Sequence, residues 1–223
     1  MLKYLALFSV VIGTYHFVSF KAALMSATII FLYFIYQLKL FQSIKFSLGY
    51  FPETELFYGE YLGEYKNIGN KFLELTQILM KFQINDANYS QVGIYYDNPE
   101  KVKDPKKCRA VYGIARTDQG THGKDLEDYL LKSGFKKAVI PGTQCLTSLF
   151  EYVYKISMII GIVKYYKALT KNMGDEGFKR QFTVRGNFQG SVEVYTDKSI
   201  QFFMPYENEA KFNLTTLPQP EYN

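Results

Sequence analysis

The side chains of this 223-residue sequence that could carry out chemistry are few and far apart. Nucleophilic catalysis needs a Ser, Cys or Thr beside a base, and a third group that orients the base. The two histidines are His16, in a long apolar run, and His122, in a glycine-flanked loop with no nucleophile nearby. We therefore expect no catalytic residues and a protein that is not an enzyme.

Metal and cofactor chemistry are not indicated either. The sequence has no His-x-x-x-His pair, no Cys-x-x-Cys pair and no cluster of acids, so we expect no metal site. The glycine-containing stretches "GTQC" and "MGDEG" lack the spacing and the lysine of a phosphate-binding loop, so we expect no cofactor.

The two cysteines, Cys108 and Cys145, are too few for a disulfide framework and indicate free thiols in a reducing compartment. Cys108 stands next to Arg109, which could lower the pKa of its thiol and make it reactive. The alternative, which we favour, is a small buried residue at the start of a strand.

One stretch, "VGIYYDNPEKVKDPKKCRAVYGI", combines tyrosines, acids and basic residues and could belong to a site. Its alternating apolar residues predict strands over 91–97 and 107–116. The first strand stops at Asp97-Asn98-Pro99, because proline lacks a backbone donor and disfavours helix at the residue before it. We interpret the stretch as a hairpin that defines the fold and does not catalyse a reaction.

The strand at 190–196, "GSVEVYT", alternates in the same way. Val192 and Val194 point to one face, and Glu193 and Tyr195 to the other. We expect the valines to face a core covered by helices and the glutamate and tyrosine to face a groove or solvent.

Periodicity elsewhere predicts two units, each with the order strand, helix, strand, strand. The helices expected are 66–82, 124–133 and 152–170. The other strands expected are 43–50, 54–61, 135–140, 144–150, 181–186 and 199–205. Two such units can pair into one antiparallel sheet with both main helices on one face, which is an α+β fold with a concave groove on the other face.

The N-terminal residues 4–38 are apolar apart from Lys21 and are long enough for a membrane anchor, since about 20 residues span a bilayer. Either two short spans, near 4–20 and 22–38, form a hairpin, or a single span covers 22–40. We favour the hairpin, because Lys21 would then lie at the headgroups and not at the costly bilayer centre. The domains expected are an anchor over 1–40, a folded domain over 41–206 and a short extended tail over 207–223.

Composition limits the classes of partner. Hydrophobic residues make up 48% of the chain and aromatic residues 17%, which is enough for a substantial core. The net charge of +5 is mild and the lysines are scattered, so we expect no nucleic-acid partner. The expected partners are membrane lipids and other subunits of a membrane complex.

Four runs of sequence, in order, resemble the GyrI-like domain, and in particular its membrane-anchored testis-expressed protein 264 family. They are "FYGEYLGEY", "IYYDNPEKV", "KCRAVYG" and "VEVYTDKSIQFFMPY". The resemblance implies a duplicated strand–helix–strand–strand domain with a groove that binds small ligands. It also implies that Glu193, on the penultimate strand, faces that groove, where Tyr195, Tyr58 and Tyr95 could line it.

Two functions follow as hypotheses. In the first, the domain is an interaction module or an accessory subunit of a larger membrane complex, possible in respiration. Base rates then favour the inner mitochondrial membrane. In the second, the protein is a ligand-binding protein or receptor of the endoplasmic reticulum, as the resemblance implies for selective autophagy. That family works through a long acidic tail, which we do not find after the last predicted strand.

Overall fold

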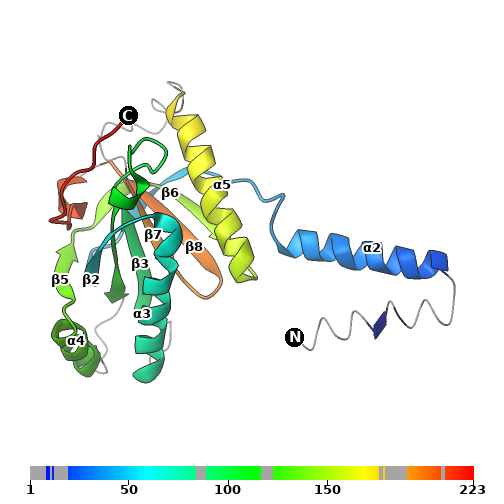
Figure 1. The fold of residues 1–223 in the computed structure, drawn as a ribbon, viewed down its shortest axis with the longest axis horizontal. Coiled ribbons are helices and arrows are strands. Elements are labelled where there is room, and N and C mark those ends of the chain that lie inside the picture. Colours follow the sequence, from blue (N-terminus) through cyan, green and yellow to red (C-terminus); the bar gives the residue numbers. More distant parts are fainter. Residues whose placement is uncertain are drawn as a thin grey trace.

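The computed structural model describes most of the chain and shows one folded unit with a projecting N-terminal helix (Figure 1). The described residues are 9–10, 12, 20–83, 89–116, 123–175, 178, 190–206 and 209–223.

The longer helices are α2 (Phe20–Gln37), α3 (Gly69–Lys81), α4 (Gly123–Lys132) and α5 (Lys155–Met173). Short 3₁₀ helices are η1 (Tyr65–Asn67), η2 (Pro105–Lys107) and η3 (Glu209–Phe212). The strands are β1 (Ser47–Phe51), β2 (Thr54–Leu62), β3 (Tyr89–Tyr95), β4 (Arg109–Arg116), β5 (Lys136–Ile140), β6 (Thr143–Glu151), β7 (Ser191–Tyr195) and β8 (Ser199–Pro205).

The strands form one curled antiparallel sheet in the order β1-β6-β8-β7-β3-β4-β2-β5. The order is symmetric about its centre. The unit β2–α3–β3–β4 matches the unit β6–α5–β7–β8, and the two units meet where β3 pairs with β7. The outer strands are exchanged, because β1 precedes β2 in sequence but pairs with β6, while β5 precedes β6 but pairs with β2. This exchange ties the two units into a single domain.

Helices α3, α4 and α5 cover one face of this sheet. Leu75 and Leu79 of α3 and Leu126 and Leu130 of α4 pack against the β2–β4 part. Helix α5 packs with Tyr165 and Leu169 over β6 and β8. Gly161 allows α5 to come close, because a Cβ there would lie 2.3 Å from the Phe150 ring of β6.

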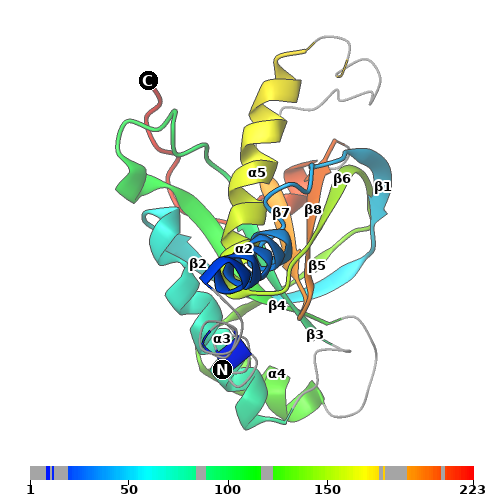
Figure 2. The same ribbon diagram turned by 90° about the vertical axis from the view of Figure 1, so that its right-hand side faces the viewer.

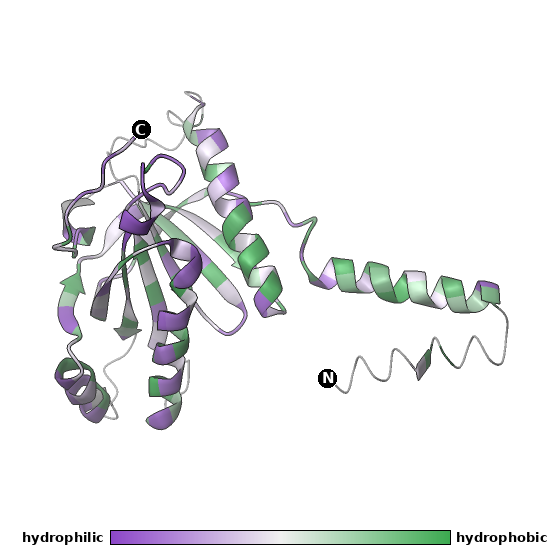
Figure 3. Ribbon diagram, viewed as in Figure 1, coloured by the Kyte–Doolittle hydropathy of each residue, from purple (hydrophilic) through white to green (hydrophobic). Residues whose placement is uncertain are grey.

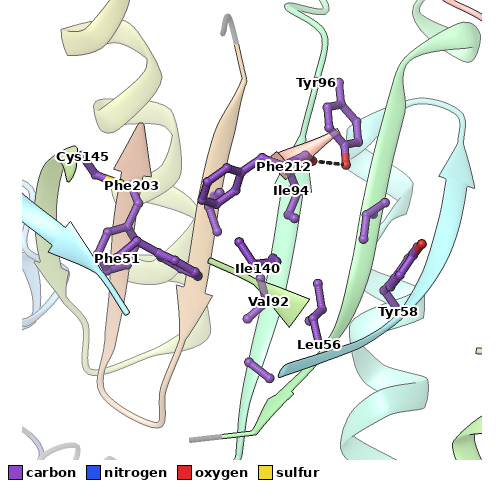
Figure 4. Close-up of a cluster of buried hydrophobic side chains, with 13 residues drawn as sticks. Phe51, Leu56, Tyr58, Val92, Ile94, Tyr96, Ile140, Cys145, Phe203 and Phe212 are labelled. Atoms are coloured by element: carbon purple, nitrogen blue, oxygen red, sulfur yellow. Dashed lines mark hydrogen bonds between the residues drawn. The ribbon is translucent and has the colours of Figure 1, made fainter. Parts of the chain in front are cut away.

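The opposite, inner face of the sheet is filled by a second apolar cluster (Figure 4). Val92, Ile94 and Val192 contribute to it from the central strands. Phe212 of η3 closes it and is fully buried, and the Tyr96 hydroxyl donates a hydrogen bond of 2.8 Å to the Phe212 carbonyl. Residues 209–223 are therefore packed onto the domain and do not form a separate tail.

Helix α2 differs from the other helices, because its apolar side chains are exposed all round (Figure 3). Its 18 residues are the one stretch of helix in the described residues that is long and apolar enough to cross a membrane. The hydroxyls of Ser26 and Thr28 donate to carbonyls one turn earlier, at 2.9 Å each, so neither is left unpaired in an apolar medium.

The predicted fold class is confirmed: an α+β domain with a duplicated strand–helix–strand–strand pattern and the main helices on one face. Helix 66–82 begins later, at Gly69, and helix 152–170 runs from Lys155 to Met173. The predicted strand 43–50 is shorter and shifted, at Ser47–Phe51. The predicted strand 181–186 and most of the predicted span 4–20 lie outside the described residues.

Candidate functional site

Glu193 lies at the centre of the sheet, beneath the helices. It is on β7, directly opposite Gly93 of β3 and Phe202 of β8. Its neighbours on β7, Val192 and Val194, point to the inner face, so Glu193 points to the face covered by α3 and α5. Only 1% of its surface is exposed.

Tyrosine hydroxyls hold both oxygens of this carboxyl group. Tyr166 of α5 donates to Oε1 at 2.8 Å, and Tyr195 of β7 donates to Oε2. The hydroxyls of Tyr195 and Tyr95 are 3.1 Å apart and share a further hydrogen bond. The result is a buried network from β3 through β7 to α5.

Aromatic rings surround the network. The ring of Phe72 of α3 lies against that of Tyr195, with 5.0 Å between centroids, and Tyr65 meets Tyr95 edge to face at 5.0 Å. Gly93 makes room for these rings, because a Cβ there would lie 2.8 Å from the Tyr95 ring and 3.1 Å from Phe72 Cζ. The Glu193 carboxyl therefore sits in a cage of rings and hydroxyls.

Burial raises the pKa of Glu193 from its ordinary value of 4.5 to about 7, although the hydrogen bonds from Tyr195 and Tyr166 act in the opposite direction. Burial also raises the pKa values of Tyr95, Tyr166 and Tyr195 well above 10, so these side chains stay neutral donors. No basic side chain within the described ranges forms an ion pair with Glu193.

The structure brings together three of the four predicted groove residues: Glu193, Tyr195 and Tyr95. The face predicted for them is wrong, because they lie under the helices and the valines face the inner cluster. Tyr58 lies on that inner face, where its hydroxyl is 3.4 Å from the Leu214 carbonyl that accepts from it. The reason is that both faces are buried, so alternation alone does not show which face the helices cover.

Sequence reasoning missed Tyr166, Phe72 and Gly93 as members of the site. Tyr166 was predicted only as an apolar position of the helix. The signal available for it was a polar-tipped "YY" pair on the inward face of a helix, since buried tyrosine hydroxyls need partners. Its neighbour Tyr165 has such a partner too, because the Ser191 hydroxyl donates to the Tyr165 hydroxyl at 3.2 Å.

The Asp97–Arg109 hairpin forms a structural clamp. The side chain of Asp97 is fully buried and accepts from the Arg109 Nη2 at 2.8 Å, Nε at 3.1 Å and backbone N–H at 2.7 Å. The Tyr222 hydroxyl adds a fourth bond of 2.7 Å to Asp97. This carboxylate is paired in every direction, so the stretch holds the C-terminal segment in place, as expected of a residue that defines the fold.

Neither cysteine is poised to react. Both are buried, and burial raises the pKa of Cys108 to about 11, to which the nearby Asp97 contributes. The interpretation of Cys108 as a small buried residue is confirmed. Within the part of the chain that is described, no group of three His, Cys, Asp or Glu side chains is placed to hold a metal ion.

Comparison with known proteins shows a distant homologue. Human testis-expressed protein 264 is 25% identical over 167 residues, which cover 74% of this chain and 48% of that protein. The chain thus spans about half the length of this curated relative. No family model matches the chain.

Solved structures share the general shape of the fold. The C-terminal domain of EcmrR is 14% identical, with a TM-score of 0.44 over 73% of this chain and 96% of that one. A structure of a protein bound to tetraphenylphosphonium is 10% identical, with a TM-score of 0.44 over 74% of this chain and 94% of that one.

Proposed function

We propose that this chain is a membrane-anchored, non-enzymatic binding protein of the GyrI-like type, and that its domain takes a hydrophobic organic cation at Glu193. The observation that carries the proposal is the burial of this carboxyl group without a counter-charge. An isolated carboxylate is costly to bury, so it is held at a pKa of about 7 and gains from any cation that enters.

The surroundings of Glu193 suit such a ligand. The rings of Phe72, Tyr95 and Tyr195 present aromatic faces, which attract cations, and an apolar lining is the usual wall of a small-molecule site. The cage is closed around Glu193. A ligand therefore enters by displacing these rings, over Gly93, and by taking over hydrogen-bonding space from Tyr195.

A binding test uses two probes of the same shape and opposite charge. Tetraphenylphosphonium should bind the full-length protein in detergent, and tetraphenylborate should not. Glu193→Gln should weaken tetraphenylphosphonium binding by about 30-fold, the equivalent of about 2 kcal/mol for a buried charge interaction. Glu151→Gln, at an exposed carboxylate of β6, is the matched control and should bind as the unmodified protein does.

Equal binding of the two probes, or equal affinity of Glu193→Gln and the unmodified protein, would contradict the proposal. Calorimetry measures both affinities directly.

Helix α2 is the proposed anchor, since it is apolar throughout and only 6% of it is buried within the protein. Extraction of membranes with alkaline carbonate should leave the full-length protein in the pellet. Its release into the supernatant would show that α2 does not span the bilayer.

A second candidate is an interaction module or accessory subunit of a membrane complex. One observation favours it: both oxygens of Glu193 already have tyrosine donors, so the network is complete without a ligand. Failure of every cationic probe, together with stoichiometric co-purification of other membrane proteins, would favour this candidate. The inner mitochondrial membrane and the endoplasmic reticulum both stay predictions, and so does a receptor role.

A further inference from the structure

Helix α5 presents an exposed apolar stripe at its N-terminal half. Ile156, Ile159 and Val163 recur at helical spacing, and Val153 precedes them. Each exposes between 50% and 61% of its surface. The opposite side of the helix is packed onto the sheet through Ser157, Gly161, Tyr165 and Leu169. A contiguous apolar strip on a helix that is already docked calls for something that covers it.

The stripe begins where the membrane helix ends. The ring of Phe34, in the last turn of α2, lies 6.1 Å from the ring of Tyr154, the residue before α5. Lys164 of α5 then holds the segment that follows α2, since its Nζ donates to the carbonyls of Lys39, at 3.2 Å, Leu40 and Gln42, at 2.8 Å. These contacts fix α2 and α5 relative to each other.

The orientation of the two helices suits a membrane surface. In Figure 1, α2 leaves the domain on the side where α5 lies, and α5 runs steeply across the direction of α2. Viewed from that side, in Figure 2, α2 projects toward the viewer and α5 extends along the near side of the sheet. A membrane crossed by α2 would therefore lie against α5, along the length of the helix.

The charges of α5 fit lipid headgroups. The exposed face that carries Ile159 and Val163 continues as Lys167 and Lys171, and Lys155 is exposed at the start of the helix. The helix contains no acidic residue. Apolar residues with flanking lysines and no acids are the pattern of a helix that lies in the boundary between headgroups and acyl chains of an anionic membrane.

We infer that the α5 stripe (Val153, Ile156, Ile159 and Val163) rests in the lipid headgroup region of the membrane that α2 crosses. The domain is thus not suspended on a free linker but is held against the bilayer through α5. This inference rests on the proposed anchor. Its occupant is lipid and not a protein partner, because the stripe is continuous with a helix whose own apolar surface needs lipid.

The test uses full-length protein in vesicles of phosphatidylcholine and phosphatidylserine. A fluorescent label is attached at one introduced cysteine, and the vesicles contain lipids with a quenching nitroxide near the headgroup. Ile159→Cys reports on the stripe, and Ile29→Cys reports on α2. Val139→Cys, on edge strand β5, is the control, since it is another exposed apolar residue with a similar exposure of 59%. The native cysteines are buried, and unmodified protein checks that they do not react.

Quenching at Ile159→Cys and Ile29→Cys, with none at Val139→Cys, is the expected result. Quenching at Ile29→Cys alone would overturn the inference and leave the anchor intact. Quenching at neither of these two positions would overturn both. Equal quenching at Ile159→Cys and Val139→Cys would show unspecific adsorption of the domain and would also overturn the inference.

A second variant removes the apolar stripe without touching the buried side of the helix. Ile156→Glu together with Val163→Glu should abolish the quenching at Ile159→Cys and leave that at Ile29→Cys unchanged. Near-ultraviolet circular dichroism of the same protein should be unaltered, because both positions are exposed. Unchanged quenching at Ile159→Cys would overturn the inference.

Discussion

Gly93 and Glu193 lie directly opposite each other on β3 and β7, the two strands at which the halves of the sheet meet. The glycine leaves the space over its backbone to the rings of Tyr95 and Phe72, and these rings help to enclose the carboxyl group. A buried acid and a residue without a side chain are thus parts of one arrangement.

Gly93→Ala should destabilise the domain by about 1–3 kcal/mol, because the added methyl group overpacks the space between β3 and α3. Gly69→Ala is the control, since a Cβ at the start of α3 meets nothing within 4 Å and alanine favours helix. Chemical denaturation of both variants measures the difference. Equal stability of the two would mean that the rings do not pack over Gly93 as described.

The stability of the protein should fall as the pH rises from about 4.5 to about 7. Below this window Glu193 is protonated in the folded and unfolded states alike. Within it the unfolded chain releases the proton at the ordinary pKa of 4.5, while the folded protein keeps it until about 7. The stability lost is about 3 kcal/mol at most, from about 1.4 kcal/mol for each unit of pKa difference.

Glu193→Gln removes this dependence, because the amide does not titrate. The variant should gain stability relative to the unmodified protein as the pH rises from 5 to 8, and the gain should approach zero at the acidic end. Denaturation curves collected across this range measure it. A constant difference between the two proteins at every pH would show that Glu193 is not the buried titrating group.

Asp97→Asn should cost about 3–5 kcal/mol, because it leaves the Arg109 guanidinium in a buried clamp without its counter-charge. Glu100→Gln, in the exposed loop next to it, should change stability by less than about 0.5 kcal/mol. Proteolysis should also show release of the C-terminal segment in Asp97→Asn, since Tyr222 loses its acceptor. Similar effects of the two substitutions would mean that the clamp is solvated.

Phe212→Ala should destabilise the domain by about 3–5 kcal/mol, as expected for an aromatic ring removed from a packed core. The ring meets Phe51 edge to face at 5.5 Å and is fully buried. Phe41→Ala, at a phenylalanine that is 84% exposed, is the matched control. A harmless Phe212→Ala would show that the inner face of the sheet is stable without the C-terminal segment.

Local pattern was enough to predict the duplicated units, the main helices and the hairpin around Asp97-Asn98-Pro99. These depend on the spacing of apolar residues and on proline, which act over a few neighbouring residues. The alternation of Val192, Glu193, Val194 and Tyr195 was also predicted correctly, because side chains along a strand always point to opposite faces.

The tertiary structure decided which face each of these residues meets. Tyr58 and Tyr95 were expected to share a face, but the register places Tyr58 opposite Gly113 and Val92, on the inner side, and Tyr95 opposite Ser191, under the helices. Strand pairing across the chain sets this register, and no local periodicity contains it. Phe212 shows the same limit: it stands in a polar-looking segment, yet it closes the inner face, because the curl of the sheet creates an apolar surface that only a distant part of the chain can cover.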